Sequence, residues 1–150
     1  MFKLTLLLLA AIFGIYTVLQ KRDRFANVIC SLQVLGIAMI ISSKAQLQLV
    51  GFYALFAATL LAVIYALKPQ HNTRKKAVLL LISVIVLAAY ILKAFHLQGI
   101  AVLAWFMIIP VAAFIFMLKD YKNYEKEIGF ASILAVEAGI RFSDLFLMAG

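Results

Sequence analysis

Three charged residues lie within an apolar segment near the end of the chain. Glu137, Arg141 and Asp144 are separated by four and three residues, which places all three on one stripe of an α-helix. Charged groups in such a setting can form ion pairs, bind an ion or solute, or recognise a partner of opposite charge. Glu137 precedes Arg141 by one turn, the order that favours ion pairing. We expect Lys93, near the end of another apolar segment, to pair with Asp144.

The remaining residues that could carry chemistry form no complete site. His71 lies in a polar stretch and is expected to be a solvated loop residue, while His96 is expected to have a structural role at a hairpin. Cys30 is the single cysteine, so no disulfide can form within the chain. The sequence has no phosphate loop, nucleophile elbow or zinc motif. We therefore predict no catalytic residue, no cofactor and no metal ligand.

The composition shows what must surround these residues. Hydrophobic residues make up 67% of the 150 positions and charged residues 13%, whereas an ordinary soluble domain is about half apolar and about a quarter charged. A water-soluble fold of this size could not bury so much apolar surface. The formal charge of +8 comes from short basic clusters between apolar runs, which is typical of membrane proteins rather than of nucleic-acid binding. We predict a lipid bilayer as the solvent.

Six apolar segments are predicted to be transmembrane helices of one all-α, polytopic integral membrane bundle. Each is close to the roughly 20 residues that cross a 30 Å hydrocarbon layer. Their predicted ranges are 2–20, 25–42, 47–67, 77–95, 97–118 and 128–149, within a single transmembrane domain of residues 1–150. An alternative has five spans and an amphipathic C-terminal helix on the cytoplasmic surface, because the sixth segment carries the charged stripe.

The distribution of basic residues predicts an orientation. The connectors 21–24, 68–76 and 119–126 together hold ten of the 14 lysines and arginines. The opposite side holds only Lys3, Lys44 and Lys93. Positive loops stay on the cytoplasmic side of a membrane. We therefore place these three connectors in the cytoplasm and the N-terminus outside, in a bacterial inner membrane.

Helix packing also leaves a pattern in the sequence. Small residues recur every fourth position on two segments, which allows helix backbones to approach closely in a bilayer. These predicted packing positions are Ala54, Ala58, Ala62, Ala66, Ala131, Ala135, Gly139 and Ser143. Pro110 lacks the backbone donor that a continuous helix needs, so we expect a kink there.

Three functions fit this pattern. A charged helix is marginally stable alone in lipid and needs neighbours, because each central charge costs roughly 2.5–3.5 kcal/mol. Our first hypothesis is therefore a non-enzymatic accessory or assembly subunit of a larger membrane complex, with other membrane subunits docking on the C-terminal helix. The second is a small solute or ion carrier or channel, with a polar path at Glu137 and Asp144.

The third hypothesis follows from a resemblance. The stretch Arg-Phe-Ser-Asp-Leu-Phe at 141–146 resembles the last helix of the lysoplasmalogenase-type membrane hydrolases. That resemblance implies a multi-helix membrane protein with acidic residues inside the membrane. It would make the chain a lipid-modifying enzyme that uses the carboxylates of the charged stripe.

Overall fold

The computed structural model describes residues 2–20, 23–42, 44–95 and 100–148, and its regular elements are helices. In this described part the helices are α1 (Phe2–Leu19), α2 (Arg24–Ile41), α3 (Ala45–Ala66), α4 (Thr73–Ala94), α5 (Ile100–Phe106), α6 (Ile108–Lys119), α7 (Tyr121–Tyr124) and α8 (Ile128–Met148). They contain no strand between them, so the all-helical fold class predicted from the sequence is confirmed.

Three of the described helices indicate a membrane location. α2, α3 and α4 are each long and apolar enough to cross a bilayer. They have 18, 22 and 22 residues, or roughly 27–33 Å at 1.5 Å per residue. α8 has 21 residues but carries the charged stripe. The membrane character of the chain is thus supported in general terms, and six crossings remain a prediction.

The predicted helix 97–118 is divided in two. α5 ends at Phe106 and α6 begins at Ile108, with Met107 between them. Pro110 has no N–H to donate to the carbonyl of Phe106, and its ring crowds that carbonyl. The interruption therefore falls within one turn before the proline, and residues 97–99 lie outside the described part.

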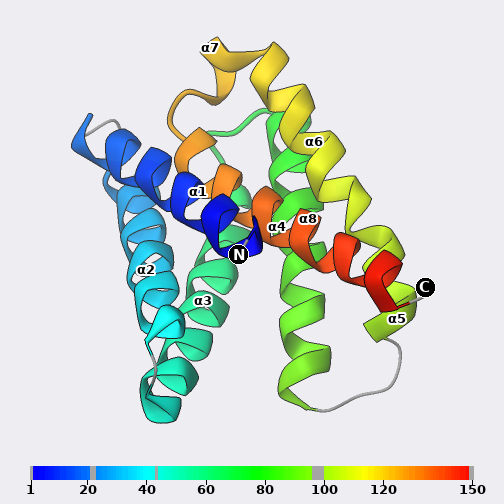
Figure 1. The fold of residues 1–150 in the computed structure, drawn as a ribbon. Helices are drawn as coiled ribbons and strands as arrows, with labels where there is room; N and C mark the ends of the chain where they lie inside the picture. The colour runs from blue at the N-terminus through cyan, green and yellow to red at the C-terminus, as the bar shows by residue number, and fades with distance from the viewer. Residues whose placement is uncertain (1, 21–22, 43, 96–99, 149–150) are drawn as a thin grey trace.

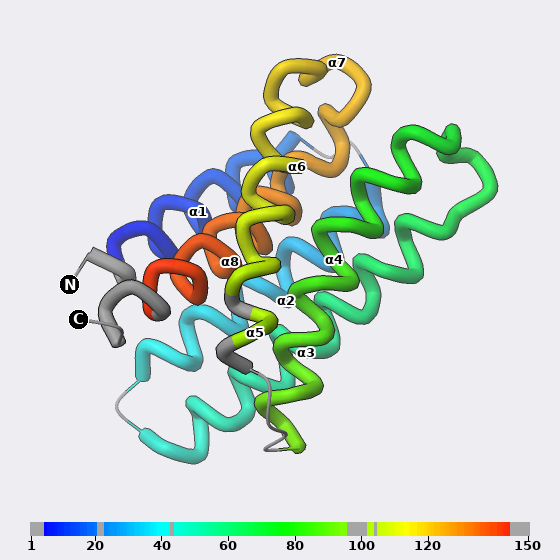
Figure 2. The backbone as a smooth tube through the Cα atoms, turned by 90° about the vertical axis from the view of Figure 1, so that its right-hand side faces the viewer, coloured from blue at the N-terminus to red at the C-terminus, as the bar shows by residue number. Residues whose placement is uncertain are grey.

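α8 lies inside the bundle rather than apart from it (Figure 1). It packs against α1, α2, α4, α5 and α6, and every residue from Ile128 to Ala135 is buried. α1 and α8 run side by side in opposite directions, as Figure 2 shows from the side. The C-terminal helix therefore organises the core, with most of the other helices packed around it.

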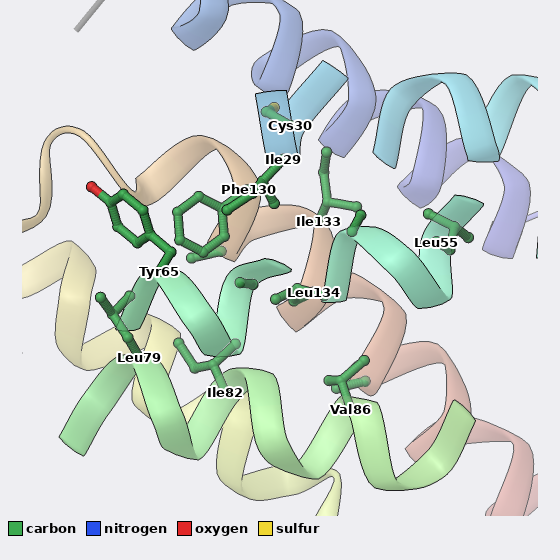
Figure 3. Packing of buried hydrophobic residues seen from close by; sticks show 14 of the residues in the cluster. Ile29, Cys30, Leu55, Tyr65, Leu79, Ile82, Val86, Phe130, Ile133 and Leu134 are labelled. Carbon is green, nitrogen blue, oxygen red and sulfur yellow. The ribbon is translucent and has the colours of Figure 1, made fainter. Parts of the chain in front are cut away.

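The core residues labelled in Figure 3 come from α2, α3, α4 and α8, and the same cluster includes Ala10 and Ala11 of α1 and Met117 of α6. Ile29 from α2, Tyr65 from α3, Ile82 from α4 and Ile133 from α8 are each at most 1% exposed. Many large apolar side chains on the outer faces are exposed, including Leu19, Val28 and Ile64. An exposed apolar exterior around a packed interior is expected when hydrocarbon surrounds the molecule.

Small residues permit the closest helix contacts. Of the predicted packing positions, Ala58, Ala62, Ala66, Ala131 and Ala135 are buried, while Ala54, Gly139 and Ser143 are partly exposed.

Two glycines that the sequence patterns did not single out lie at even closer contacts between helices. A Cβ on Gly51 would lie 2.6 Å from the carbonyl oxygen of Gly36, and one on Gly129 would lie 1.9 Å from Thr17 Oγ1. These glycines set the spacing of the α2–α3 and α1–α8 pairs.

The three basic connectors meet at one end of the bundle. Asp23 precedes α2 and caps it by accepting hydrogen bonds from the backbone N–H groups of Phe25 and Ala26. Lys75, in the first turn of α4, donates to the backbone oxygen of Asn123 in α7 over 2.8 Å. The placement of these connectors relative to a membrane stays a prediction.

Candidate functional site

Glu137 is bound by side chains of the same chain. Its Oε1 accepts a hydrogen bond from Arg141 Nη2 at 2.7 Å, one turn further along α8, and another from the hydroxyl of Tyr90 on α4. The Arg141 guanidinium also lies 4.5 Å from the centre of the Tyr90 ring. The side chains of Glu137 and Arg141 are only 13% and 23% exposed. The sequence predicted the pair, but Tyr90 was not among the predicted site residues.

These groups line a pocket of about 160 Å³, here called the Glu137 pocket. Lys93 shares it, and its ammonium lies 5.5 Å from the centre of the Phe52 ring. The other side chains lining the pocket are apolar or aromatic, and they come from the three helices α1, α2 and α3: Leu7, Ile37, Ile40, Ile41, Phe52 and Leu55. The structure thus brings Lys93 to the same pocket as Glu137 and Arg141.

The charges around the Glu137 pocket do not cancel. One carboxylate faces two cations, Arg141 and Lys93, so the pocket has a formal charge of +1. Apolar walls weaken dielectric screening and strengthen the field that a bound solute would experience. Asp144 lies further along α8 and is partly exposed, and its predicted pairing with Lys93 stays a prediction. The pocket is suited to a small solute that carries a negative charge.

Gln33 is a further polar group inside the bundle. It lies on α2, one turn before the pocket residue Ile37, and is fully buried. Neither its amide nitrogen nor its amide oxygen has a hydrogen-bond partner in the described part of the chain. Since an unsatisfied buried polar group costs roughly 1–3 kcal/mol, Gln33 is a position where a polar solute or a water molecule would be stabilised.

A second charged cluster, here called the Glu127 cluster, occupies the connector end. Glu127 lies just before α8 and its side chain is 0% exposed. Glu127 Oε1 forms an ion pair with Lys75 Nζ at 2.9 Å and accepts a hydrogen bond from the Tyr65 hydroxyl at 2.9 Å. That hydroxyl also lies 3.3 Å from Asp23 Oδ2. Lys68 completes the cluster, with its ammonium 4.4 Å from the centre of the Tyr65 ring.

Sequence reasoning missed the Glu127 cluster. The predicted sixth helix begins at 128 and the predicted basic connector ends at 126, so Glu127 fell between them and was given no role. The apolar residues after it, beginning with Ile128 and Phe130, indicate that the chain is already entering the core. That signal could have placed Glu127 at a buried helix start, although it would not have identified Lys75 and Tyr65 as its partners.

The expectation that His71 is solvated is wrong. Its residue is only 8% exposed, and its ring lies 5.0 Å from the Tyr65 ring, centre to centre. Burial lowers the pKa of His71, and the neighbouring Glu127 opposes this shift only in part. Its Nε2 is buried without a hydrogen-bond partner in the described residues. His71 is therefore a neutral imidazole packed beside an ion pair.

The ionisation of Asp23 is also set by this end of the bundle. Burial favours its neutral form, but hydrogen bonds from Ala26 and Phe25, the charge of Lys68 and the Tyr65 hydroxyl together outweigh that effect and lower its pKa. Asp23 is thus held as a carboxylate.

The function of the two charged clusters has to be inferred from their own residues. Within the described ranges, no three His, Cys, Asp or Glu side chains are grouped closely enough to hold a metal ion. Comparison with protein-family models, with curated proteins and with solved structures finds no match. The Glu137 pocket, which combines charge, burial and space, is the strongest candidate for a functional site.

Proposed function

We propose that this chain is a six-span membrane protein that binds and carries a small anionic or zwitterionic solute through the Glu137 pocket. The observation that carries the proposal is the placement of Glu137, Arg141, Lys93 and Tyr90 around one pocket with otherwise apolar walls. Ionisable groups inside a membrane are costly and commonly mark the path of a solute or an ion.

Helix lengths support the six crossings. α5 and α6 together run from Ile100 to Lys119, about 30 Å if they act as one interrupted span. α8 is about as long, and its Glu137 and Arg141 have partners within the chain. An interrupted helix in a membrane is tolerated where neighbours shield its free backbone groups, and α4 and α8 both contact α5 and α6.

The pocket favours solute binding over docking through the charged stripe. Docking was predicted because Glu137 and Arg141 needed partners, and Tyr90 now supplies one from the same chain. A lipid-modifying enzyme would require a second reacting group beside Glu137, whereas the other charged groups lining the pocket are the cations Arg141 and Lys93.

Solute flux tests the proposal. The purified protein is reconstituted into liposomes, and swelling is followed by light scattering in isotonic solutions of potassium nitrate, potassium chloride or glycine, with valinomycin present in the two salts so that K⁺ accompanies the anion. We expect protein-dependent swelling with at least one of these solutes, reduced about tenfold or more by Arg141→Gln and Lys93→Gln because each removes a cation from the pocket. Lys119→Gln is the matched control at the exposed end of α6. Equal flux in all variants would exclude a path through the pocket.

An accessory role is a second candidate, and a different surface favours it. Between α1, α6 and α8 lies an apolar groove of about 280 Å³, lined in part by Gly139 and Ser143. A Cβ on Gly139 would meet only Val111 Cγ2, at 3.7 Å, so this part of the small-residue ladder has space in front of it. We infer that a transmembrane helix of another subunit would fit there.

Crosslinking distinguishes this second role. A Ser143→Cys protein, with Cys30 replaced by serine, is labelled at its single thiol with a benzophenone maleimide and irradiated in native membranes, so that a nearby C–H bond of any partner can react. Crosslinked species larger than the monomer, absent for Leu118→Cys on the exposed face of α6, would support docking at the groove. A product found only as monomer for both variants would refute it.

A further inference from the structure

A second pocket lies at the connector end, away from the Glu137 pocket. It has a volume of about 280 Å³ and is formed by the loop before α4, the first turn of α4 and the region around α7. We call it the loop pocket. Its lining is polar: Gln70, His71, Asn72, Arg74, Lys75, Asp120, Asn123 and Tyr124. None of these residues lines the Glu137 pocket, so the two sites can be tested separately.

We propose that the loop pocket binds a phosphate group. Arg74 supplies a guanidinium, which binds phosphate oxygens through paired hydrogen bonds. Asn72 caps α4 by accepting a hydrogen bond from the backbone N–H of Lys75 at 2.8 Å. The positive end of this 22-residue helix therefore opens at the pocket, where helix N-termini favour anions.

His71 is the independent observation that points to a ligand. It lines the loop pocket, is more than nine-tenths buried, and has an Nε2 with no hydrogen-bond partner in the described residues. Such an orphan atom costs free energy unless a bound group satisfies it. A protonated phosphate oxygen can donate a hydrogen bond to this nitrogen of the neutral imidazole.

The other charged side chains of the pocket already have partners within the chain. The carboxylate oxygens of Asp120 accept hydrogen bonds from the Asn123 amide at 2.8 and 2.9 Å. Lys75 is paired with Glu127. The guanidinium of Arg74 lies over the Phe116 ring at 4.7 Å, an arrangement that leaves the edge of the guanidinium plane for hydrogen bonding. Arg74 is thus the cation available to a ligand.

A phosphate group in the loop pocket can come from either of two kinds of molecule. The pocket lies on the connectors, at one end of helices that are long enough to cross a membrane, so the phosphate could belong to a phospholipid headgroup or to a free solute. Both present phosphate oxygens to Arg74 and His71, and only the attached group differs.

Binding to the full-length protein in a phosphate-free maltoside detergent tests the proposal. One arm titrates inorganic phosphate, followed by ³¹P line broadening, and the other titrates dioleoyl phosphatidylglycerol with dioleoylglycerol as the phosphate-free control, followed by native mass spectrometry. We expect saturable binding in at least one arm, weakened about tenfold or more by Arg74→Gln, because the variant removes the charge-assisted hydrogen bonds of the guanidinium. The responding arm identifies the source.

Two variants make the result decisive. Lys76→Gln removes the same charge two positions away and leaves the lining of the pocket intact, so it should bind as the wild type does. His71→Phe keeps an aromatic ring against Tyr65 but removes Nε2, and it should weaken binding several-fold while the protein still folds. Absence of saturable binding in both arms, or equal losses in Arg74→Gln and Lys76→Gln, would overturn the proposal.

Discussion

The ion pair between Lys75 and Glu127 should dominate the stability of the connector end. At an Nζ–Oε1 distance of 2.9 Å and an effective dielectric constant of about 20, two unit charges attract by about 6 kcal/mol. Desolvation of both ions offsets part of this attraction. Removal of one partner from a buried pair nevertheless costs about 3–5 kcal/mol, because the other charge is left uncompensated.

The two partners should respond differently to substitution. Lys75→Met leaves the Glu127 carboxylate, whose side chain is 0% exposed, without its cation, so we expect a loss of about 3–5 kcal/mol. Glu127→Gln still accepts the Tyr65 hydroxyl bond, and the 17% exposed Lys75 side chain can turn toward water. We expect this variant to lose about 1–3 kcal/mol.

A double-mutant cycle measures the coupling. Lys75→Met should add little cost once Glu127 is glutamine, so the double variant should be about as stable as Glu127→Gln alone. The assay is reversible unfolding in mixed maltoside–dodecyl sulfate micelles, followed by circular dichroism. Lys76→Met is the control and should change stability by no more than about 0.5 kcal/mol. Costs of the two single variants that simply add in the double variant would refute the buried pair.

Three further predictions use other parts of the bundle. Gly129→Ala should destabilise the protein by about 1–3 kcal/mol because the new Cβ would lie 1.9 Å from Thr17 Oγ1. Gly139→Ala on the same helix should be nearly neutral in the same unfolding assay. Equal effects of the two substitutions would contradict the close contact between α1 and α8 at Gly129. Folding lowers the pKa of His71 from 6.5, so the unfolded protein binds a proton at this residue more readily than the folded protein does. Stability should therefore fall as the pH drops below about 6.5, and His71→Phe should reduce that fall in thermal melts between pH 5 and 8. Identical pH profiles for the two proteins would count against a buried neutral His71. Cysteines introduced at Gln70 and Lys44, with Cys30 replaced by serine, should react with an impermeant maleimide from the cytoplasmic and outer sides of the membrane, respectively; labelling from one common side would disprove the orientation.

Some of the fold can be read from local sequence alone. Long apolar runs leave an α-helix as the structure that satisfies every backbone group in lipid, and the regular elements of the described residues are helices as predicted. The i, i+4 spacing of Glu137 and Arg141 also determined their ion pair, because two residues one turn apart on a helix are neighbours whatever surrounds them. Pro110 likewise marked the region where the fifth apolar segment divides.

Contacts between distant segments depended on the tertiary structure. Tyr90 is 47 residues from Glu137, and Tyr65 is 62 residues from Glu127; hydropathy and periodicity report only local environment, so neither pairing has a signal in the sequence. The burial of Glu127 and His71 has the same cause, because three connectors must fold together before either side chain leaves water. The sequence by itself therefore determined helices, their apolar exterior and one local ion pair, whereas the packing of the helices decided which polar groups share a pocket.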